Sequence, residues 1–152
     1  MTDPIVRIVK IDALRAAVFH GFSKTPENDA HQARLAWAQQ KGLLGNRSTY
    51  LLLGRNNPPP SPGKAEYGYD CMITISDGVE PEDEIQIEEI TAGLYAVVRT
   101  NLANMNKQWH WLYNWVENSQ YTIAGHGLEE ILCGDESDPD TFLFDLWLPV
   151  TE

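Results

Sequence analysis

Basic residues are scarce in this chain. Among its 152 residues, 11 lysines and arginines stand against 22 aspartates and glutamates, which leaves a formal net charge of −11. Proteins bind nucleic acid largely by neutralising phosphates with lysine and arginine side chains. We therefore expect no direct nucleic-acid binding, and an acidic field that favours cationic ligands.

Long hydrophobic runs are missing as well. No segment approaches the roughly 20 apolar residues of a membrane helix, and Asp12 and Arg15 interrupt the stretch where a signal peptide would be apolar. The two cysteines, Cys71 and Cys133, and the four scattered histidines have no metal-binding spacing. Glycine-rich phosphate loops and nucleophile elbows do not occur. We expect a cytoplasmic protein that uses no membrane, metal or cofactor.

What the chain does contain is an internal repeat. The segment IVKIDALRAAVFHG (8–21) has the same residue as IEEITAGLYAVVRT (87–100) at five of fourteen positions. A helical pattern follows each copy, over 26–42 after the N-cap and proline pair Thr25-Pro26, and over 104–120. Two short strands follow each helix, at 49–54, 69–75, 129–134 and 144–150. The pattern β-α-β-β therefore occurs twice, which predicts an α+β fold.

We expect the repeat to close into one domain over 1–152, with modules at about 5–76 and about 84–150. The expected architecture is an antiparallel sheet with two helices on one face and a ligand groove between pseudo-twofold halves. The acidic run DGVEPEDE (77–84) is interpreted as a solvated linker between the modules. The run NNPPPSPGK (56–64) is interpreted as a semi-rigid surface loop or as a motif for an aromatic groove.

Four segments in order resemble one protein family. They are EYGYDCMITI (66–75), GLYAVV (93–98), LEEIL (128–132) and DLWLPV (145–150). Together they resemble the GyrI-like family, which comprises effector-binding domains fused to bacterial multidrug-sensing transcription activators and also found alone.

The chain departs from this family at three places. VVRTNLANM (97–105) replaces the usual His-x-Gly-Pro turn, and Ile131 stands where tyrosine is frequent. No helix-turn-helix segment precedes Ile5, so we expect a stand-alone ligand module.

The resemblance implies a pocket for bulky, flat, lipophilic cations. A carboxylate in an apolar, aromatic-lined cavity is costly unless it is paired, so it either takes up a proton or binds a cation. A cation about 4 Å away gains roughly 4 kcal/mol at an effective dielectric near 20. Each aromatic face adds roughly 0.5–2 kcal/mol by cation–π attraction. Such a site tolerates many cations.

The carboxylate that matches the family is Glu129, which strand alternation places on the face of Ile131 and Cys133. Glu130 points to the opposite face and aligns with Tyr50 in the first module. Alternation alone does not decide between the two glutamates. The expected ligand-binding residues are Glu129, Trp147, Tyr69, Trp111, Ile131, Trp109, Tyr67, Tyr95 and Met72, the last as the counterpart of Trp147.

The run WHWLYNW places tryptophans on two sides of the second helix. Trp109, Leu112 and Val116 form one stripe, and Trp111 and Trp115 form another. One stripe must pack on the sheet. The other is a pocket wall or a subunit contact, and we favour a pocket wall that contains Trp109 and Trp111 together.

Three functions remain open. The favoured one is a non-catalytic module that binds lipophilic cations. The second is implied by the resemblance, because some stand-alone members of the family resemble hydrolases that open strained rings in genotoxic compounds. Glu129 would then be the general base and Tyr69 or Asp145 the acid. The third, implied by the founding branch of the family, is an acidic inhibitor of DNA gyrase that imitates DNA. A homodimer, DNA gyrase and a transcription regulator are the protein partners that the sequence leaves open.

Overall fold

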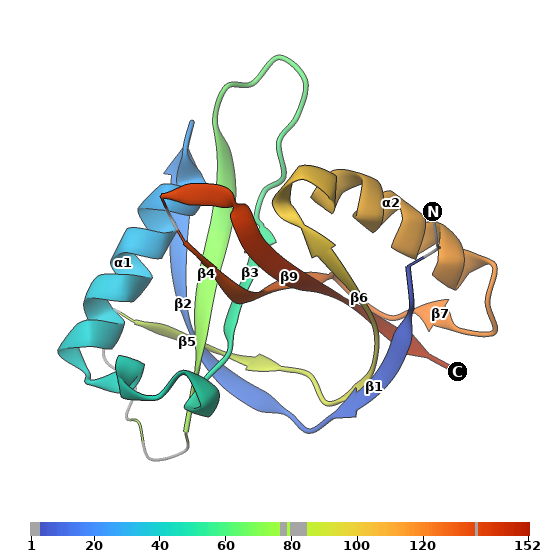
Figure 1. The fold of residues 1–152 in the computed structure, drawn as a ribbon, viewed down its shortest axis with the longest axis horizontal. Coiled ribbons are helices and arrows are strands. Elements are labelled where there is room, and N and C mark those ends of the chain that lie inside the picture. The colour runs from blue at the N-terminus through green and yellow to red at the C-terminus, as the bar shows by residue number, and fades with distance from the viewer. Residues whose placement is uncertain (1–3, 77–78, 80–84, 136) are drawn as a thin grey trace. The chain divides into compact units, whose positions relative to one another are not determined.

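The computed structural model describes residues 4–76, 79, 85–135 and 137–152. Of the acidic run 77–84, all but Val79 therefore lies outside the described residues. The chain forms two compact units: unit 1 comprises Met1–Ala13 with Thr91–Glu152, and unit 2 comprises Leu14–Ile90. Each unit consists of antiparallel strands and one α-helix (Figure 1), which confirms the predicted α+β class.

Unit 2 contains a four-stranded antiparallel sheet in the order β3-β4-β2-β5. One face of this sheet is covered by α1. The core between them includes Ala17, Phe19 and Ile73 from the strands, with Trp37 and Ala38 from the helix. The elements of unit 2 are β2 (Leu14–Ser23), α1 (Pro26–Gln40), β3 (Leu52–Asn56), β4 (Tyr67–Ile75) and β5 (Gln86–Ile90).

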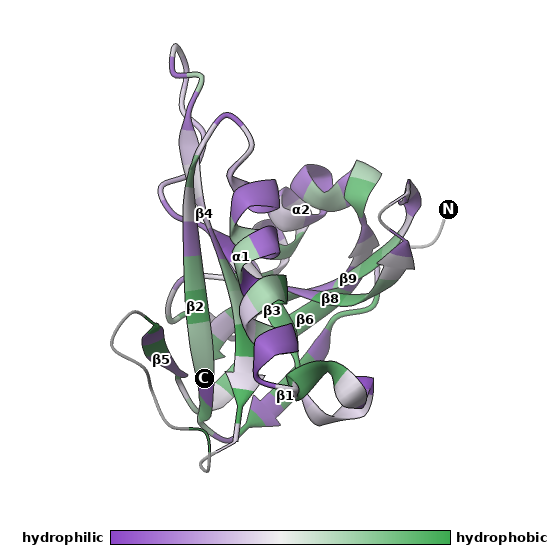
Figure 2. Ribbon diagram, turned by 90° about the vertical axis from the view of Figure 1, so that its left-hand side faces the viewer, coloured by the Kyte–Doolittle hydropathy of each residue, from purple (hydrophilic) through white to green (hydrophobic). Residues whose placement is uncertain are grey.

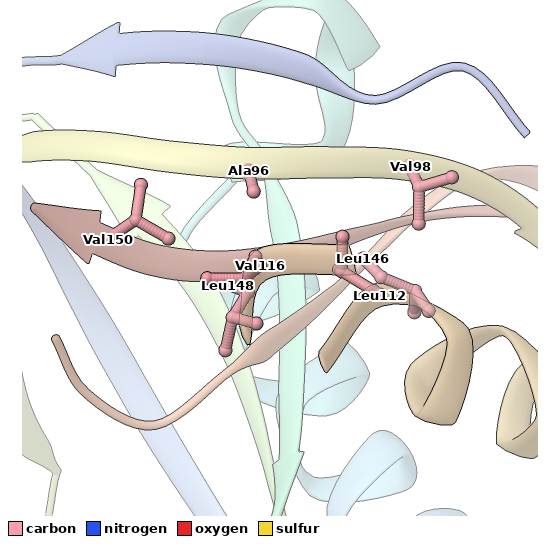
Figure 3. Packing of buried hydrophobic residues seen from close by; sticks show 7 residues of the cluster. All are labelled: Ala96, Val98, Leu112, Val116, Leu146, Leu148 and Val150. Carbon is pink, nitrogen blue, oxygen red and sulfur yellow. The ribbon is translucent and has the colours of Figure 1, made fainter. Parts of the chain in front are cut away.

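Unit 1 contains strands in the order β1-β6-β9-β8, and the short β7 also pairs with β9. Leu112 and Val116 of α2 are fully buried against the sheet, where they meet valine, leucine and alanine side chains of β6 and β9 (Figure 3). The elements of unit 1 are β1 (Arg7–Ile11), β6 (Gly93–Asn101), α2 (Met105–Glu117), β7 (Thr122–Ile123), β8 (Leu128–Asp135) and β9 (Asp138–Thr151).

Each copy of the sequence repeat forms two strands where one was expected. Segment 8–21 contains β1 and β2 on either side of Asp12 and Ala13. Segment 87–100 contains β5 and β6, and the second begins at Gly93, whose φ of 140° suits glycine. The leading strands are exchanged, because β1 pairs with β6 whereas β5 pairs with β2. Each repeat therefore contributes its first strand to the sheet of the other.

Local sequence explains most of the element boundaries. Proline occupies the first turn of α1, and the chain leaves that helix through Gly42 in the left-handed conformation. β3 begins three residues later than predicted, because Arg47–Thr49 form a 3-10 turn in which the Asn46 side chain accepts a hydrogen bond from the Ser48 amide. Figure 2 shows hydrophobic residues along β2 and hydrophilic residues on the turns of α1. No helix of the described residues is long and apolar enough to cross a membrane.

Candidate ligand-binding site

Strand pairing assigns the two adjacent glutamates of β8 to opposite faces of unit 1. Residues that pair across antiparallel strands share a face of the sheet. Glu129 pairs with Leu146, which belongs to the core under α2. Glu130 pairs with Asp145 on the face that α2 does not cover. Trp147 lies two residues beyond Asp145 on β9, and therefore on the same face as Glu130.

Glu129 fastens the second helix to β8. The indole N–H of Trp109 on α2 donates a hydrogen bond of 2.9 Å to Glu129 Oε2. The Trp109 ring also lies over Gly127, where an added Cβ would be 2.5 Å from the ring. Both contacts place the Glu129 carboxylate between the helix and the sheet.

Glu130 lies beside two aromatic rings on the other face. The indole N–H of Trp147 donates a hydrogen bond of 3.2 Å to Glu130 Oε1. The rings of Trp147 and Tyr95 meet edge to face, with centroids 5.6 Å apart and planes at 62°. The Tyr95 hydroxyl donates to the Thr91 carbonyl at 2.7 Å, and burial raises the pKa of Tyr95. Each of the three side chains belongs to a residue at most 9% exposed, so this carboxylate and its two rings form a buried cluster.

Asp145 holds two arginines next to this cluster. Arg7 of β1 donates to Asp145 Oδ2 at 2.9 Å, and Arg99 of β6 donates to Asp145 Oδ1 at 3.1 Å. The hydrogen bond to Asp145 is the main cause that raises the pKa of Arg99, and the charge of Glu130 contributes further. Asp145 thus has its charge balanced by arginine, and Glu130 accepts a hydrogen bond from an indole N–H.

The equivalent positions of unit 2 carry different side chains. Asp70 pairs with Arg55 as Asp145 pairs with Glu130, so the register makes Arg55 the counterpart of Glu130. The predicted alignment of Glu130 with Tyr50 is therefore wrong, because Tyr50 precedes β3. By the same register Met72, which is fully buried, is the counterpart of Trp147.

Asp70 is the centre of a polar network on this face of unit 2. Its carboxylate contacts His20 Nδ1 at 2.7 Å, Arg55 Nε at 3.0 Å and Asn57 Nδ2 at 3.0 Å. Arg55 also donates to both oxygens of Glu88. Burial raises the pKa of Asp70, but the hydrogen bonds from Asn57, His20 and Arg55 outweigh it and hold that pKa below its usual value.

Two of the three tyrosines predicted for the site, Tyr67 and Tyr69, lie on the side of unit 2 that α1 covers. The Tyr67 hydroxyl donates to the Glu27 carboxylate of α1 at 2.7 Å, and burial together with this contact raises the pKa of Tyr67 to about 12. Tyr69 packs over Gly54, because an added Cβ there would meet its ring. Both therefore belong to the helix side, whereas Met72 faces the other way.

A β-bulge changes the end of β8. Ile131 shares the face of Glu129, as alternation predicts, and it pairs with Phe144. The register then shifts, and Cys133 pairs with Leu143 on the Glu130 face. The prediction that Cys133 shares a face with Glu129 is therefore wrong.

Trp109 and Trp111 do not form one wall. Trp109 turns toward the sheet and Glu129, whereas Trp111 lines an open depression on α2. This depression has a volume of about 390 Å³, and its lining residues are Trp111, Asn114, Trp115, Asn118 and Ser119.

The sequence analysis did not predict a role for Arg7 or Arg99, nor that Asp145 binds both arginines. Aspartate follows an aromatic residue in both final strands of the repeat, at Asp70 and Asp145. Its repetition in two copies was the available indication that this position binds cationic side chains.

Small-molecule sites are lined mainly by apolar and aromatic side chains with a few placed polar groups, and the cluster of Glu130, Trp147 and Tyr95 has side chains of these kinds. The chain belongs to the GyrI-like family: the family model described as the GyrI-like small molecule binding domain matches residues 5–151. No curated protein matches the chain.

Solved structures share the fold at low sequence identity. The EcmrR C-terminal domain is 13% identical with a TM-score of 0.71, and the match covers 98% of each chain. SAV2435 bound to tetraphenylphosphonium is 11% identical with a TM-score of 0.59, covering 97% of this chain and 94% of that one. A hydrolase from Listeria innocua is 10% identical with a TM-score of 0.71, covering 96% and 91%. In its complex with DNA, EcmrR is a longer chain, of which this chain spans 58%.

Proposed function

We propose that this protein binds lipophilic aromatic cations, with Glu130 as the countercharge and Trp147 and Tyr95 as aromatic walls. The observation that carries this proposal is the buried hydrogen bond from the Trp147 indole to the Glu130 carboxylate, with Tyr95 edge-on to the same indole. A negative charge and two aromatic rings therefore lie together in one cluster, which supports the proposal.

The physical terms at this cluster favour a flat cation. Burial strips water from the carboxylate, so a cation about 4 Å away gains roughly 4 kcal/mol at an effective dielectric near 20. The ring faces of Trp147 and Tyr95 each add roughly 0.5–2 kcal/mol. The indole N–H and the Thr91 carbonyl hold both rings in place before a ligand arrives, so little ordering is required on binding.

Glu130 suits this role better than Glu129. The Glu129 carboxylate lies between α2 and β8, where Trp109 donates to it. Displacing that contact would disturb the attachment of the helix. Glu130 lies on the face without a helix, beside the rings that a cation would contact.

The comparisons support a ligand of this class. The family is described by small-molecule binding, and SAV2435, which shares the fold, has been solved with the lipophilic cation tetraphenylphosphonium.

Calorimetric titration tests the proposal. We expect wild-type protein to bind tetraphenylphosphonium with micromolar affinity, and to bind uncharged triphenylphosphine oxide at least about tenfold more weakly, since the neutral compound loses the interaction with the carboxylate. Equal affinity for the two compounds, or no binding of either, would refute the cation site.

Hydrolysis is the second candidate. The neighbour from Listeria innocua is a hydrolase, and Glu130 faces Asp145 across β8 and β9. However, the arginine donors occupy both Asp145 oxygens, so this group is not placed to donate a proton to a leaving atom. Product formation from a strained-ring electrophile, lost in Glu130→Gln, would favour this candidate over simple binding.

A further inference from the structure

The depression on α2 is a second feature with the properties of a binding site. Its volume of about 390 Å³ falls within the range of about 300–1,000 Å³ that ligand sites occupy. Its lining contains two half-buried indoles, Trp111 and Trp115, which alternate along the chain with two asparagines. No charged residue is among the lining residues. It lies apart from the buried face of Glu130.

Several hydrogen-bond donors of this depression have no acceptor in the part of the chain that the structure describes. Among the described residues, neither the Trp111 nor the Trp115 indole N–H makes a hydrogen bond, and the Asn114 side chain makes none either. Asn118 uses one amide hydrogen to bond the Asn114 carbonyl at 2.8 Å. An occupant that supplies carbonyl oxygens and flat apolar surface would therefore complement the depression.

The loop between β3 and β4 supplies such groups. It extends beyond the ends of both strands (Figure 1), and residues 57–66 are all exposed. It contains the run Pro58-Pro59-Pro60-Ser61-Pro62. Each proline fixes its own φ and restricts the preceding residue to extended conformations, so the run favours polyproline II. The carbonyls of Pro58 and Ser61 accept hydrogen bonds from the Gly68 and Lys64 amides, and the carbonyls of Pro59, Pro60 and Pro62 are left to accept from an indole N–H.

The depression and the proline run match in length, and both lack charged residues. From Trp111 to Asn118 the helix rises roughly 10 Å, and from Pro59 to Pro62 a polyproline II segment extends about 9 Å. The lining residues of the depression and the run from Pro59 to Pro62 carry no charge, and the exposed Glu117 of α2 is not among the lining residues. Two molecules of net charge −11 can therefore meet here without direct repulsion between the contacting side chains.

We propose that the proline-rich loop of one copy of this protein occupies the α2 depression of a second copy. Proline rings pack on the indoles of Trp111 and Trp115, and the indole N–H groups donate to prolyl carbonyls, as aromatic grooves do for proline-rich peptides. The contact joins two different surfaces, so it is heterologous and builds open chains or a ring.

A peptide tests the contact directly. Residues 56–64 (NNPPPSPGK) are titrated into the protein while tryptophan fluorescence is followed, with a control peptide that carries alanine at the four proline positions. We expect a saturable change with the natural peptide alone, weakened at least about tenfold in Trp115→Ala. Trp115→Phe keeps an aromatic ring but lacks the N–H donor, so it controls for a folding defect. Its affinity for the natural peptide should lie between those of wild type and Trp115→Ala. Absence of a saturable change, or equal affinity in Trp115→Ala, would overturn the proposal.

Sedimentation velocity then tests the second copy as occupant. Wild type should gain mass as its concentration rises. Trp115→Phe, and separately a loop variant with alanine at positions 59, 60 and 62, should associate more weakly. Mixing the two variants should restore one heterodimer, because one supplies an intact loop and the other an intact depression. A wild type that stays monomeric, or variants that associate as wild type does, would overturn it.

Discussion

At the scale of single residues, Glu129 and Glu130 divide two tasks between adjacent positions. Each accepts a hydrogen bond from a tryptophan indole, but the tryptophans come from different elements. Trp109 belongs to α2, so its contact with Glu129 attaches a helix. Trp147 belongs to β9, so its contact with Glu130 holds an indole ring against the face of the sheet that α2 does not cover. One step along a strand therefore separates a structural carboxylate from the proposed ligand carboxylate.

Alternation along β8 predicts that the two glutamates face opposite sides, and it predicts Ile131 beside Glu129. It does not say which side the helix covers, because both faces of β8 carry an apolar residue next to a glutamate. Only the pairing with Leu146 and Asp145 decides this. The bulge after Ile131 was equally hidden, since no glycine or proline marks it in 131–133.

The carboxylate of Asp70 predicts a pH dependence of stability. Its pKa is below the usual value in the folded state. Its contribution is therefore complete above the ordinary aspartate pKa of about 3.9 and is lost as pH falls through the lower folded pKa. In urea unfolding, the free-energy difference between wild type and Asp70→Asn should have its full size at about pH 5 and shrink below about pH 4.

His20→Gln serves as the matched variant, because it removes one partner and leaves the carboxylate in place. A difference between wild type and Asp70→Asn that grows on acidification would contradict the assignment.

At the scale of elements, short-range signals predict helices and strand segments but not their partners. Thr25-Pro26 and Gly42 mark the ends of α1, and the period of Leu112 and Val116 marks the buried side of α2. The exchange of β1 and β5 between the sheets arises from pairings distant in sequence, such as Ile8 with Ala96. Such pairings leave no local pattern.

The junction of β3 and β4 allows a test at this scale. A Cβ added to Gly68 would collide with the backbone carbonyl of Asn57, which is not able to move as a side chain does. Gly68→Ala should therefore lower the free energy of unfolding by about 1–3 kcal/mol or more, as in other overpacked sites. Gly45→Ala is the control, because nothing lies within 4 Å of that position, and it should change stability by less than about 0.5 kcal/mol. Equal losses of stability in Gly68→Ala and Gly45→Ala, measured by thermal or urea unfolding, would contradict the predicted collision.

At the scale of the whole molecule, the net charge of −11 and the buried Glu130 both favour cations, but they respond differently to salt. Screening weakens surface charges beyond the Debye length and affects buried ones much less. Raising sodium chloride from about 0.05 M to about 0.5 M should therefore weaken tetraphenylphosphonium binding by less than about threefold. A loss of an order of magnitude or more would assign the attraction to the overall field.

The central claim is that Glu130, and not its neighbour, is the countercharge for a lipophilic cation. The measurement that tests it most directly is the tetraphenylphosphonium affinity of Glu130→Gln and Glu129→Gln side by side with wild type. Glutamine keeps size and an accepting oxygen in both variants, so only the charge is removed. We predict that Glu130→Gln binds at least about tenfold more weakly, while Glu129→Gln binds as wild type does. Loss of affinity in Glu129→Gln alone would contradict the account.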